Sequence, residues 1–503
     1  MKSKIQSVLI ANRSEIAIRI IRACREMGIR TVAVYSDADQ TALHPQMADA
    51  AFNIGPAPSS QSYLRQDVII ETAIRAKCDA IHPGYGFLSE NADFAERVEN
   101  AGLIFIGPPS DAIRAMGDKT SARKLMQTHG VPTVPGTEEA IRVPEESVEV
   151  CEKIGYPVLI KAAAGGGGKG MRIVQKREDL FSAITSSQNE ARSAFGDDRV
   201  YIEKYLEKPR HIEFQIVADA HGNIVHLGER ECSIQRRHQK VIEESPSAIM
   251  TKEMREKIGA SAITAARVSG YRNAGTVEFL VDKHLNYYFL EMNTRLQVEH
   301  PVTEMVTGID LVKTQIRIAQ GEALQFTQEQ IVQRGHAIEC RLCAEDARNN
   351  FLPSIGKIEY YKPSQGFGVR EDSGIEQGTE IQVHYDPMFA KLIAWAGTRE
   401  EAIERMKRAL KEYRIVGIDT TIPFCQYVLH HPKFIAGDFD THFVQQHFEP
   451  SRLFDESIEQ EQVAILAAIL SNERRNGSTN GAAVRTATNA SGWKAKRRTE
   501  QLR

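Results

Sequence analysis

The stretch KAAAGGGGKGMRIV (residues 161–174) places four consecutive glycines between two segments that resemble strands. Gly165, Gly167 and Gly170 satisfy the GxGxxG pattern, but that dinucleotide fingerprint requires a helix to begin at the last glycine. Apolar residues typical of a strand follow instead. A Walker A loop is excluded too, because Gly170 follows Lys169 where a serine or threonine would bind Mg²⁺. The pattern predicts a glycine hairpin that folds over phosphates, or a surface hairpin without a ligand.

The composition is that of an ordinary globular chain with several domains. The 503 residues are 42% hydrophobic and 26% charged, and a chain of this length exceeds one hydrophobic core. The net charge of −3 creates no field that favours nucleic acid or an anionic membrane. No apolar run approaches the ~20 residues that span a bilayer. Because strand-like sequence begins near residue 7, no room remains for a leader, and we predict a cytoplasmic protein.

The seven cysteines are scattered and odd in number, which argues against a disulfide framework. Cys340 and Cys343 form a CxxC pair without a second pair nearby. On a strand, positions i and i+3 point to opposite faces. We therefore expect packed thiols here rather than a metal or redox site.

The first part of the chain predicts a doubly wound α/β unit. Residues 7–35 have the pattern strand, helix, strand, with Ser14 as the helix N-cap and Gly28 at the helix end. Further alternation extends this unit over residues 1–112. The loop HPGYGFLSEN (residues 82–91) follows a strand, and loops at the carboxyl ends of parallel strands are where such sheets bind ligands.

The remaining sequence divides into five further segments. Residues 113–134 look helical, and residues 135–205 form a smaller α/β unit that contains the glycine hairpin. Strands dominate the first part of residues 212–331, and residues 336–447 have an α+β pattern. Residues 448–503 change character to a short apolar-faced helix followed by a Gly/Ser/Thr/Asn-rich, basic tail.

The stretch EMNTRLQVEH (residues 291–300) carries an unusual set of polar side chains. In an extended chain its odd positions share one face, namely Glu291, Asn293, Arg295, Gln297 and Glu299. The alternative is the solvated face of a surface strand, although asparagine is depleted in strands. If Glu278 on the preceding strand faces Glu291, the two carboxylates and Asn293 form a hard-oxygen site for Mg²⁺ shared with nucleotide phosphates.

Cationic side chains that can hold phosphates occur in four places. Lys119 and Lys161 are lone lysines, of the kind that are usually solvated, and His211 is a third candidate. The segment ECSIQRRHQKVIEESP (residues 231–246) gathers Gln235, Arg236, His238 and Lys240. This cluster is either an exposed basic face or a site that concentrates anions.

Seven motifs in register make the sequence recognisable: IANRSEIAIRI, HPGYGFLSEN, MGDKTSARK, KAAAGGGGKGM, ECSIQRRHQKVIEESP, EMNTRLQVEHPVTEM and IECRLCAED. Together, over residues 4–447, they resemble the biotin carboxylase family of the ATP-grasp superfamily. The resemblance implies a multidomain α/β and α+β fold. An N-terminal Rossmann-like domain (1–112) precedes an ATP-grasp domain (113–335), whose glycine-rich lid spans about 135–205, and a biotin carboxylase C-terminal domain (336–447).

The implied activity is that of a ligase that forms a C–N bond. ATP phosphorylates bicarbonate to carboxyphosphate, which breaks down to CO₂ and phosphate, and the ureido nitrogen of biotin captures the CO₂. ATP and Mg²⁺ (or Mn²⁺) are the implied cofactors, and biotin is a substrate on a carrier protein. The matching metal positions are Glu278, Glu291 and Asn293. The matching nucleotide and phosphate contacts are Lys119, Lys161, Gly165, Gly166, Gly167, Gly168, His211, Gln235 and His238. The matching purine-pocket residues are Met171, Glu203, Lys204, Leu206, Leu280 and Ile415.

The resemblance also assigns the remaining chemistry. The bicarbonate site matches Arg295, Gln297, Val298, Lys240 and Glu299. Glu299 is the general base in this assignment, and Arg341 stabilises the biotin enolate. Tyr85 and Gly86 match a loop that touches the biotin ring. Ser14 stands where many family members have glycine, and Ala164 begins a glycine run that is often one residue longer.

The implied partners are separate biotin carboxyl carrier and carboxyltransferase subunits of an acetyl-CoA- or propionyl-CoA-type carboxylase. The only internal Met-Lys pair, Met406–Lys407, lies in a helical pattern, which cannot present a biotinylated lysine in a turn. Residues 448–503 with Trp493 are either a docking piece or a frayed terminus. The face of Arg19, Arg22 and Glu26 matches the homodimer region of the family.

Three other functions stay open at this point. The chain would also suit a two-subunit pyruvate carboxylase, because the acceptor is chosen by a transferase. A carbamoyl-phosphate synthetase-like ligase would share the nucleotide site. A non-catalytic ATP-grasp regulatory subunit is the alternative outside enzymes.

Overall fold

The computed structural model describes residues 5–137, 141, 147–162, 171–237 and 239–454. The chain divides into two units, residues 1–450 and 451–503, and the strands and α-helices of the described residues belong to the first unit. Gly165 to Gly168, His238 and the tail beyond residue 454 lie outside the described residues. The predicted domain limits at 112, 335 and 447 stay predictions.

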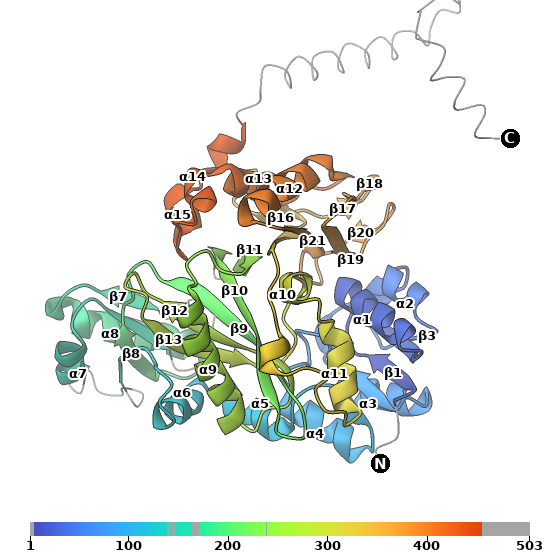
Figure 1. Ribbon diagram of the computed structural model, residues 1–503, viewed down its shortest axis with the longest axis horizontal. Helices are drawn as coiled ribbons and strands as arrows, with labels where there is room; N and C mark the ends of the chain where they lie inside the picture. The colour runs from blue at the N-terminus through green and yellow to red at the C-terminus, as the bar shows by residue number, and fades with distance from the viewer. Residues whose placement is uncertain (1–4, 138–140, 142–146, 163–170, 238, 455–503) are drawn as a thin grey trace, which may run out of the picture. The chain divides into compact units, whose positions relative to one another are not determined.

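The N-terminal part is a parallel five-stranded sheet with the order β3-β2-β1-β4-β5 (Figure 1). Its strands are β1 (Ser7–Ile10), β2 (Arg30–Tyr35), β3 (Ala50–Asn53), β4 (Ala80–His82) and β5 (Ile104–Phe105). Its helices are α1 (Ser14–Glu26), α2 (Leu43–Met47), α3 (Gln66–Arg75) and α4 (Ala92–Asn100). The strand order reverses between β1 and β4, which confirms the doubly wound prediction. At this switch point, Asn12 donates hydrogen bonds to the carbonyls of Pro83 and Tyr85 and so joins two loops.

Helix α1 begins differently from the prediction. Ser14 is the first helical residue and has a φ of +56°, while Arg13 is the N-cap and makes no side-chain capping bond. The N-cap assignment of Ser14 is therefore wrong. Gly28 does follow the helix end, with a φ of +68°, as predicted. The φ of Ser14 explains why glycine suits this position, since a Cβ disfavours the left-handed region.

Replacing Ser14 with glycine should therefore stabilise the protein. Relief of the left-handed strain outweighs the extra chain entropy of glycine by about 0.5–1 kcal/mol. We expect a higher melting temperature for Ser14→Gly. Ser14→Ala, which keeps the Cβ, is the matched control and should not be stabilised. Equal melting temperatures for the two variants would contradict the strain.

Arg19 and Glu26, two charged residues of α1, form ion pairs within the chain. Arg19 is buried, and its guanidinium lies 2.9 Å from Glu304 and 2.8 Å from Asp310. Glu26 pairs with Lys313. Arg19 is therefore not part of the exposed surface, because Glu304 and Asp310 cover it, and the match of this face to a homodimer region stays a prediction.

The centre of the molecule is an antiparallel eight-stranded sheet with the order β13-β12-β9-β10-β11-β14-β21-β19. Its strands are β9 (Arg210–Ala218), β10 (Ile224–Arg236), β11 (Gln239–Ser245), β12 (Asn273–Val281), β13 (Tyr287–Asn293), β14 (His336–Cys343), β19 (Val369–Ser373) and β21 (Met388–Ala396). β11 pairs with β14, so one sheet runs from the segment before residue 335 into the segment after it. Side chains of both segments can thus share one face.

Helices pack against the strands of this sheet. α9 (Lys252–Val268) packs on β9 and β10, and α11 (Leu311–Ala319) packs on β12 and α1 (Figure 1). α10 (His300–Thr307) packs on β10, β11, β14 and β21. The predicted helical segment 113–134 is two helices, α5 (Ser110–Gly117) and α6 (Lys119–Thr128), because Asp118 ends the first and caps the second.

The segment that contains the glycine run has its own small sheet. β6 (Val158–Ala162) pairs antiparallel with β7 (Arg172–Val174) and with β8 (Val200–Lys204). α7 (Ser147–Ile154) and α8 (Leu180–Phe195) accompany it. Two antiparallel strands on either side of the glycines confirm the hairpin and exclude the Rossmann interpretation of this stretch.

The C-terminal part adds helices and short ladders. The helices are α12 (Arg399–Glu412), α13 (Ile422–His430), α14 (Pro432–Ile435) and α15 (Phe443–His447). The ladders pair β15 (Glu345–Asp346) with β16 (Leu352–Pro353), β17 (Gly356–Lys357) with β20 (Glu380–Ile381), and β18 (Tyr360–Lys362) with β22 (Arg414–Val416). Met406 is buried in α12 and Lys407 pairs with Glu404, which confirms a helix there. All seven cysteines are free thiols, as expected.

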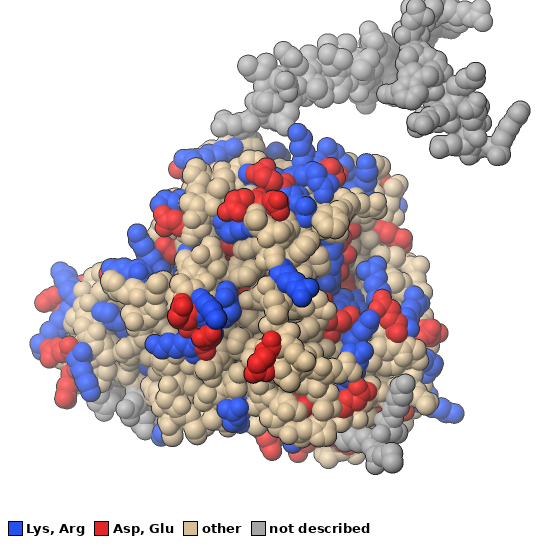
Figure 2. Space-filling model, in the orientation of Figure 1, with Lys and Arg blue, Asp and Glu red and all other residues tan. Residues whose placement is uncertain are grey.

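The surface carries charges of both signs. Figure 2 shows lysine and arginine intermixed with aspartate and glutamate over the face in view, in keeping with a net charge near zero. Among the described residues, no helix combines the length and the apolar character needed to cross a bilayer.

Candidate active site

A cavity of about 1200 Å³ opens between the N-terminal loops, the small β6–β8 sheet and the central sheet. Its lining includes Asn12 to Ile16 at the start of α1 and Tyr85 to Phe87 in the loop after β4. The predicted site residues that line it are Tyr85, Gly86, Lys119, Lys161, Met171, Glu203, Lys204, Leu206, His211, Gln235, Lys240, Glu278, Leu280, Glu291, Asn293, Arg295, Gln297, Val298, Glu299 and Arg341. Residues far apart in sequence thus meet in one cavity.

Ile415 is the exception among the described site predictions. It lies on β22, where it pairs with Tyr361 of β18, and it does not line the cavity. Thr441 and His442 line the cavity instead, and the backbone of Thr441 donates to the carbonyl of Pro209, close to Leu206. The assignment of Ile415 to the purine pocket is therefore wrong, since the β18–β22 ladder holds it elsewhere.

The metal-site prediction rests on two neighbouring strands. Glu278 of β12 lies directly opposite Glu291 of β13, as predicted. β13 ends at Asn293, however, and residues 294–299 form an irregular loop, so the predicted extended chain over 291–300 is wrong in its second half. Glu299 is instead the N-cap of α10, which has a proline in its first turn.

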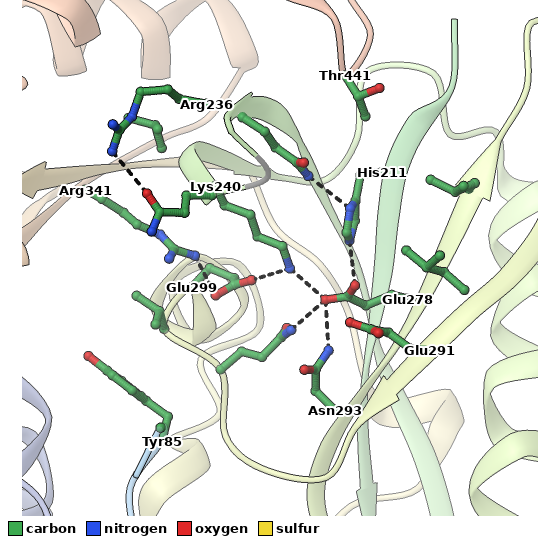
Figure 3. A pocket seen from close by; sticks show the side chains of 18 of the residues that line it. Tyr85, His211, Arg236, Lys240, Glu278, Glu291, Asn293, Glu299, Arg341 and Thr441 are labelled. Atoms are coloured by element: carbon green, nitrogen blue, oxygen red, sulfur yellow. Dashed lines mark hydrogen bonds and ion pairs between the residues drawn. The ribbon is translucent and has the colours of Figure 1, made fainter. Parts of the chain in front are cut away.

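Glu278 contacts four other side chains of the site (Figure 3). Its Oε1 lies 2.8 Å from Lys240 Nζ and accepts hydrogen bonds from the amides of Asn293 and Gln297, both at 2.9 Å. Its Oε2 lies 3.0 Å from His211 Nε2. Burial raises the pKa of Glu278, but the lowering by Lys240 and His211 is larger. Its pKa therefore lies well below the ordinary value, and the carboxylate is ionised.

Lys240 lies between three carboxylates. Its Nζ contacts Glu213, lies 2.8 Å from Glu278 and lies 2.7 Å from Glu299. Burial lowers the pKa of Lys240, but the three carboxylates raise it well above its usual value. The ammonium group is therefore a permanent positive charge in the wall of the cavity.

Glu299 is buried between two cations. Besides Lys240, its Oε2 lies 3.0 Å from Arg341 Nη2, while Arg341 Nε lies 2.6 Å from Glu243. Glu299 is only 2% exposed, and this burial raises its pKa. Lys240, Arg341 and Arg230 lower the pKa of Glu299 more strongly, so it lies well below 4.5. The group is an ionised carboxylate at neutral pH and is able to accept a proton.

The other end of the cavity carries the phosphate-binding candidates. Lys119 Nζ lies 3.2 Å from Glu291, and Lys161 Nζ lies 2.5 Å from Glu203. Gln235 donates a hydrogen bond of 3.0 Å to His211 Nδ1. These cations are held by carboxylates on the cavity wall, ready to meet a polyanion.

The oxygen donors at this end fit Mg²⁺. Glu278, Glu291 and Asn293 offer two carboxylates and an amide oxygen, which are the hard ligands that Mg²⁺ prefers. The side chain of Glu291 is 35% exposed, so this edge is open to the cavity. A second group, His211, Glu213 and Glu278, has ligand atoms within 4.8 Å of one another, but all three side chains are buried among the cations described above.

Three functional-site residues, Arg230, Glu213 and Glu90, were missed by the sequence interpretation. Arg230 of β10 is completely buried and donates to Gln297 at 2.6 Å and to Glu213, which also contacts Lys240. Glu90 lies 2.7 Å from Arg295 Nε and fixes that guanidinium. Arg230 and Glu213 lie in strands that carry further charged residues, so the local sequence did not single them out.

Arg236 takes no part in this network. Its Nη2 lies 2.8 Å from both carboxylate oxygens of Glu345, and its guanidinium stacks 4.5 Å over the ring of Phe351. Arg236 lines the cavity together with Gln235 and Lys240, but its charge is already paired with Glu345. The interpretation of the basic cluster as an anion site stays a prediction.

Three family models match successive parts of the chain. The model of the biotin carboxylase N-terminal domain matches residues 4–113, and that of the biotin carboxylase C-terminal domain matches residues 339–446. Between them, residues 118–327 match the ATP-binding domain of the carbamoyl-phosphate synthase L chain. Together the three models cover most of the chain in the order of its folded parts.

Individual proteins agree with these models. The chain is 54% identical over 443 residues to the biotin carboxylase of Nostoc sp., a match that covers 88% of this chain and 99% of that protein. It is 56% identical over 442 residues to biotin carboxylase 1 of Bacillus subtilis, with coverage of 88% and 98%. The Hydrogenobacter thermophilus 2-oxoglutarate carboxylase biotin carboxylase domain dimer, solved with MgADP, ADP and bicarbonate, is 48% identical. Its TM-score is 0.84, with coverage of 90% of this chain and 100% of that one. The chain therefore belongs to the biotin carboxylase family.

Proposed function

We propose that the chain catalyses the ATP-dependent carboxylation of biotin with bicarbonate through carboxyphosphate. The observation that carries this proposal is Glu299, an ionised carboxylate buried between Lys240 and Arg341 in the same cavity as the Glu278–Glu291 edge. A base, two fixed cations and a metal-binding edge are what the phosphorylation and transfer of a small oxyanion need.

At the nucleotide end, Lys119, Lys161 and His211 bind the phosphates. Glu278, Glu291 and Asn293 hold Mg²⁺, which supplies charge neutralisation for phosphoryl transfer when bound. Met171, Leu206 and Leu280 form apolar walls beside the purine. The Lys204 ammonium donates to the carbonyls of Gly155 and Tyr156 and so braces the small sheet.

At the bicarbonate end, Arg295 and Gln297 orient the anion and Lys240 neutralises it. The planar guanidinium suits a carboxylate-like group, and Glu90 keeps it in place. Glu299 removes the bicarbonate proton, which makes the oxygen nucleophilic toward phosphorus. After breakdown to CO₂ and phosphate, Arg341 stabilises the enolate charge that develops on biotin, whose ring lies against Tyr85 and Gly86.

The carrier and the transferase complete the reaction as partners. A biotinylated lysine on a carrier protein would enter the cavity from the Tyr85 side. The Met406–Lys407 pair cannot serve, since it is fixed in α12. The transferase selects the final acceptor in an acyl-CoA-type carboxylase, and a cytoplasmic location remains part of the proposal.

We also propose a homodimer, as in the Hydrogenobacter domain structure. Phe367 is 79% exposed, and its ring meets Trp395 at 6.2 Å next to β19, the strand that packs on α1. Aromatic residues are enriched at interfaces between subunits. Phe367→Ala should shift the protein to monomer in light scattering with sizing chromatography. Ile74→Ala, at an exposed apolar residue of α3, is the control and should leave the dimer intact.

ADP release, measured with and without bicarbonate and with and without free biotin, tests the proposed function. We expect release to require bicarbonate and to rise when free biotin is added. Bicarbonate-dependent release without any effect of biotin would favour a carbamoyl-phosphate synthetase-like ligase. No bicarbonate-dependent release at all would favour the regulatory subunit.

A further inference from the structure

Lys391 of β21 is a completely buried lysine beside the proposed site. Its Nζ donates a hydrogen bond of 2.8 Å to the carbonyl of Val298 and lies 3.3 Å from Glu15 Oε1. It also lies 5.8 Å above the ring of Tyr85. A buried ammonium is unfavourable unless such partners compensate it, so its place is tightly specified.

Glu15 continues the connection to the other side of the cavity. It lies in the first turn of α1 and is 2% exposed. Its Oε1 accepts the hydroxyl hydrogen bond of Tyr85, and its Oε2 has no hydrogen-bond partner among the described residues. Oε1 of Glu15 is therefore shared between the Tyr85 hydroxyl and the Lys391 ammonium, so these three side chains are linked to one another.

Lys391 also touches the strand that carries the enolate-stabilising arginine. It lies directly opposite Arg341 in the β14–β21 ladder and opposite Asp372 of β19 on its other side. Val298 stands between Gln297 and Glu299 in the loop before α10. The side chain of Lys391 thus reaches the proposed bicarbonate loop and the biotin-side ring, and its backbone is paired with that of Arg341.

We propose that Lys391 is a positioning residue that, through Val298 and the Glu15–Tyr85 pair, holds the bicarbonate and biotin sites in register. This inference rests on the proposed function. CO₂ formed beside Glu299 must reach the ureido nitrogen of biotin before it escapes, and a displacement of about 1 Å between reacting groups lowers rates by about 10²-fold. Neither Lys391 nor Glu15 touches a substrate in this account.

Lys391→Met tests the proposal because methionine keeps most of the volume and removes the charge. We expect biotin-dependent turnover to fall by about 10- to 100-fold while the KM for ATP changes by less than about 2-fold. An unchanged biotin-dependent rate, or a defect confined to ATP, would overturn the proposal.

A double-mutant cycle between Tyr85→Phe and Glu15→Gln gives a second test that does not require a Lys391 variant to fold. Each change should raise the KM for biotin by about 3- to 10-fold without changing the KM for bicarbonate, and the double variant should be no worse than either single one. Additive effects, or an equal rise in the KM for bicarbonate, would overturn the link between Tyr85 and Glu15.

Arg255→Met is the matched control. Arg255 forms an ion pair with the buried carboxylate of Glu229 between α9 and β10, outside the cavity lining. It should lower stability without altering any KM or the ratio of biotin-dependent to biotin-independent turnover. The wild type distinguishes failure of the proposed function from failure of the positioning role. If the wild type carboxylates biotin while the Lys391, Tyr85 and Glu15 variants lack the expected kinetic changes, only the positioning role fails.

Discussion

Glu299→Gln is expected to lower bicarbonate-dependent turnover by about 10²-fold or more and to leave ATP binding nearly intact. The amide keeps the shape of the side chain but cannot take the bicarbonate proton. Because the pKa of Glu299 lies well below 4.5, the base is ionised over the neutral range. Its own protonation should therefore cause no loss of activity between about pH 6 and pH 8. Steady-state ADP release and nucleotide titration are the measurements.

Glu244→Gln provides the matched control, since Glu244 is a buried glutamate of the same region that pairs with His336 and Arg399 and does not line the cavity. It should retain turnover. Burial raises the pKa of Glu244, but these partners lower it from 4.5 to about 2. The stability that it contributes is therefore present above pH 4.5 and lost as the pH falls toward 2. Near-normal turnover in Glu299→Gln would contradict the base assignment.

Arg341→Met should separate the two halves of the reaction. A group that stabilises charge only as it develops affects the step in which that charge appears, so biotin-dependent turnover should fall by about 10²–10³-fold. The biotin-independent, bicarbonate-dependent release of ADP should fall far less. The loss also removes a cation from beside Glu243 and Glu299, which raises the pKa of both carboxyls.

Arg399→Met is the control for this variant, because Arg399 also pairs with a buried glutamate but lies outside the cavity lining. It should be less stable and catalytically normal. If Arg341→Met reduced both activities equally, Arg341 would act in bicarbonate phosphorylation rather than in biotin activation.

The sequence predicted those parts of the fold that depend on the local hydrophobic period and on residues that end helices and strands. The alternation over the first 112 residues and the strands around the glycine run are of this kind. Ser14 failed as an N-cap because it is already the first helical residue, with a φ of +56°, and Arg13 occupies the N-cap position. The prediction of an extended chain over residues 294–299 failed because Glu299 is the N-cap of α10. The start of this helix overrides the alternating pattern.

The site was predictable to the extent that its motifs are contiguous. Glu278 and Glu291 were found because both lie on neighbouring strands joined by a short turn. Lys391 is the single charged residue of β21, whereas Arg230 lies between two glutamates in β10, and in neither case does the local sequence distinguish a buried partner from a surface charge. Ile415 was misplaced because Thr441 and His442, which come later in the sequence, line the cavity while Ile415 does not.

Transfer of label from radioactive bicarbonate to biotin tests the central claim most directly. The purified chain, with ATP, Mg²⁺ and free biotin, should form labelled carboxybiotin in amounts equal to the biotin-dependent ADP released, and the Glu299→Gln variant should form almost none. Label that never appears in biotin while ATP is consumed would contradict the account.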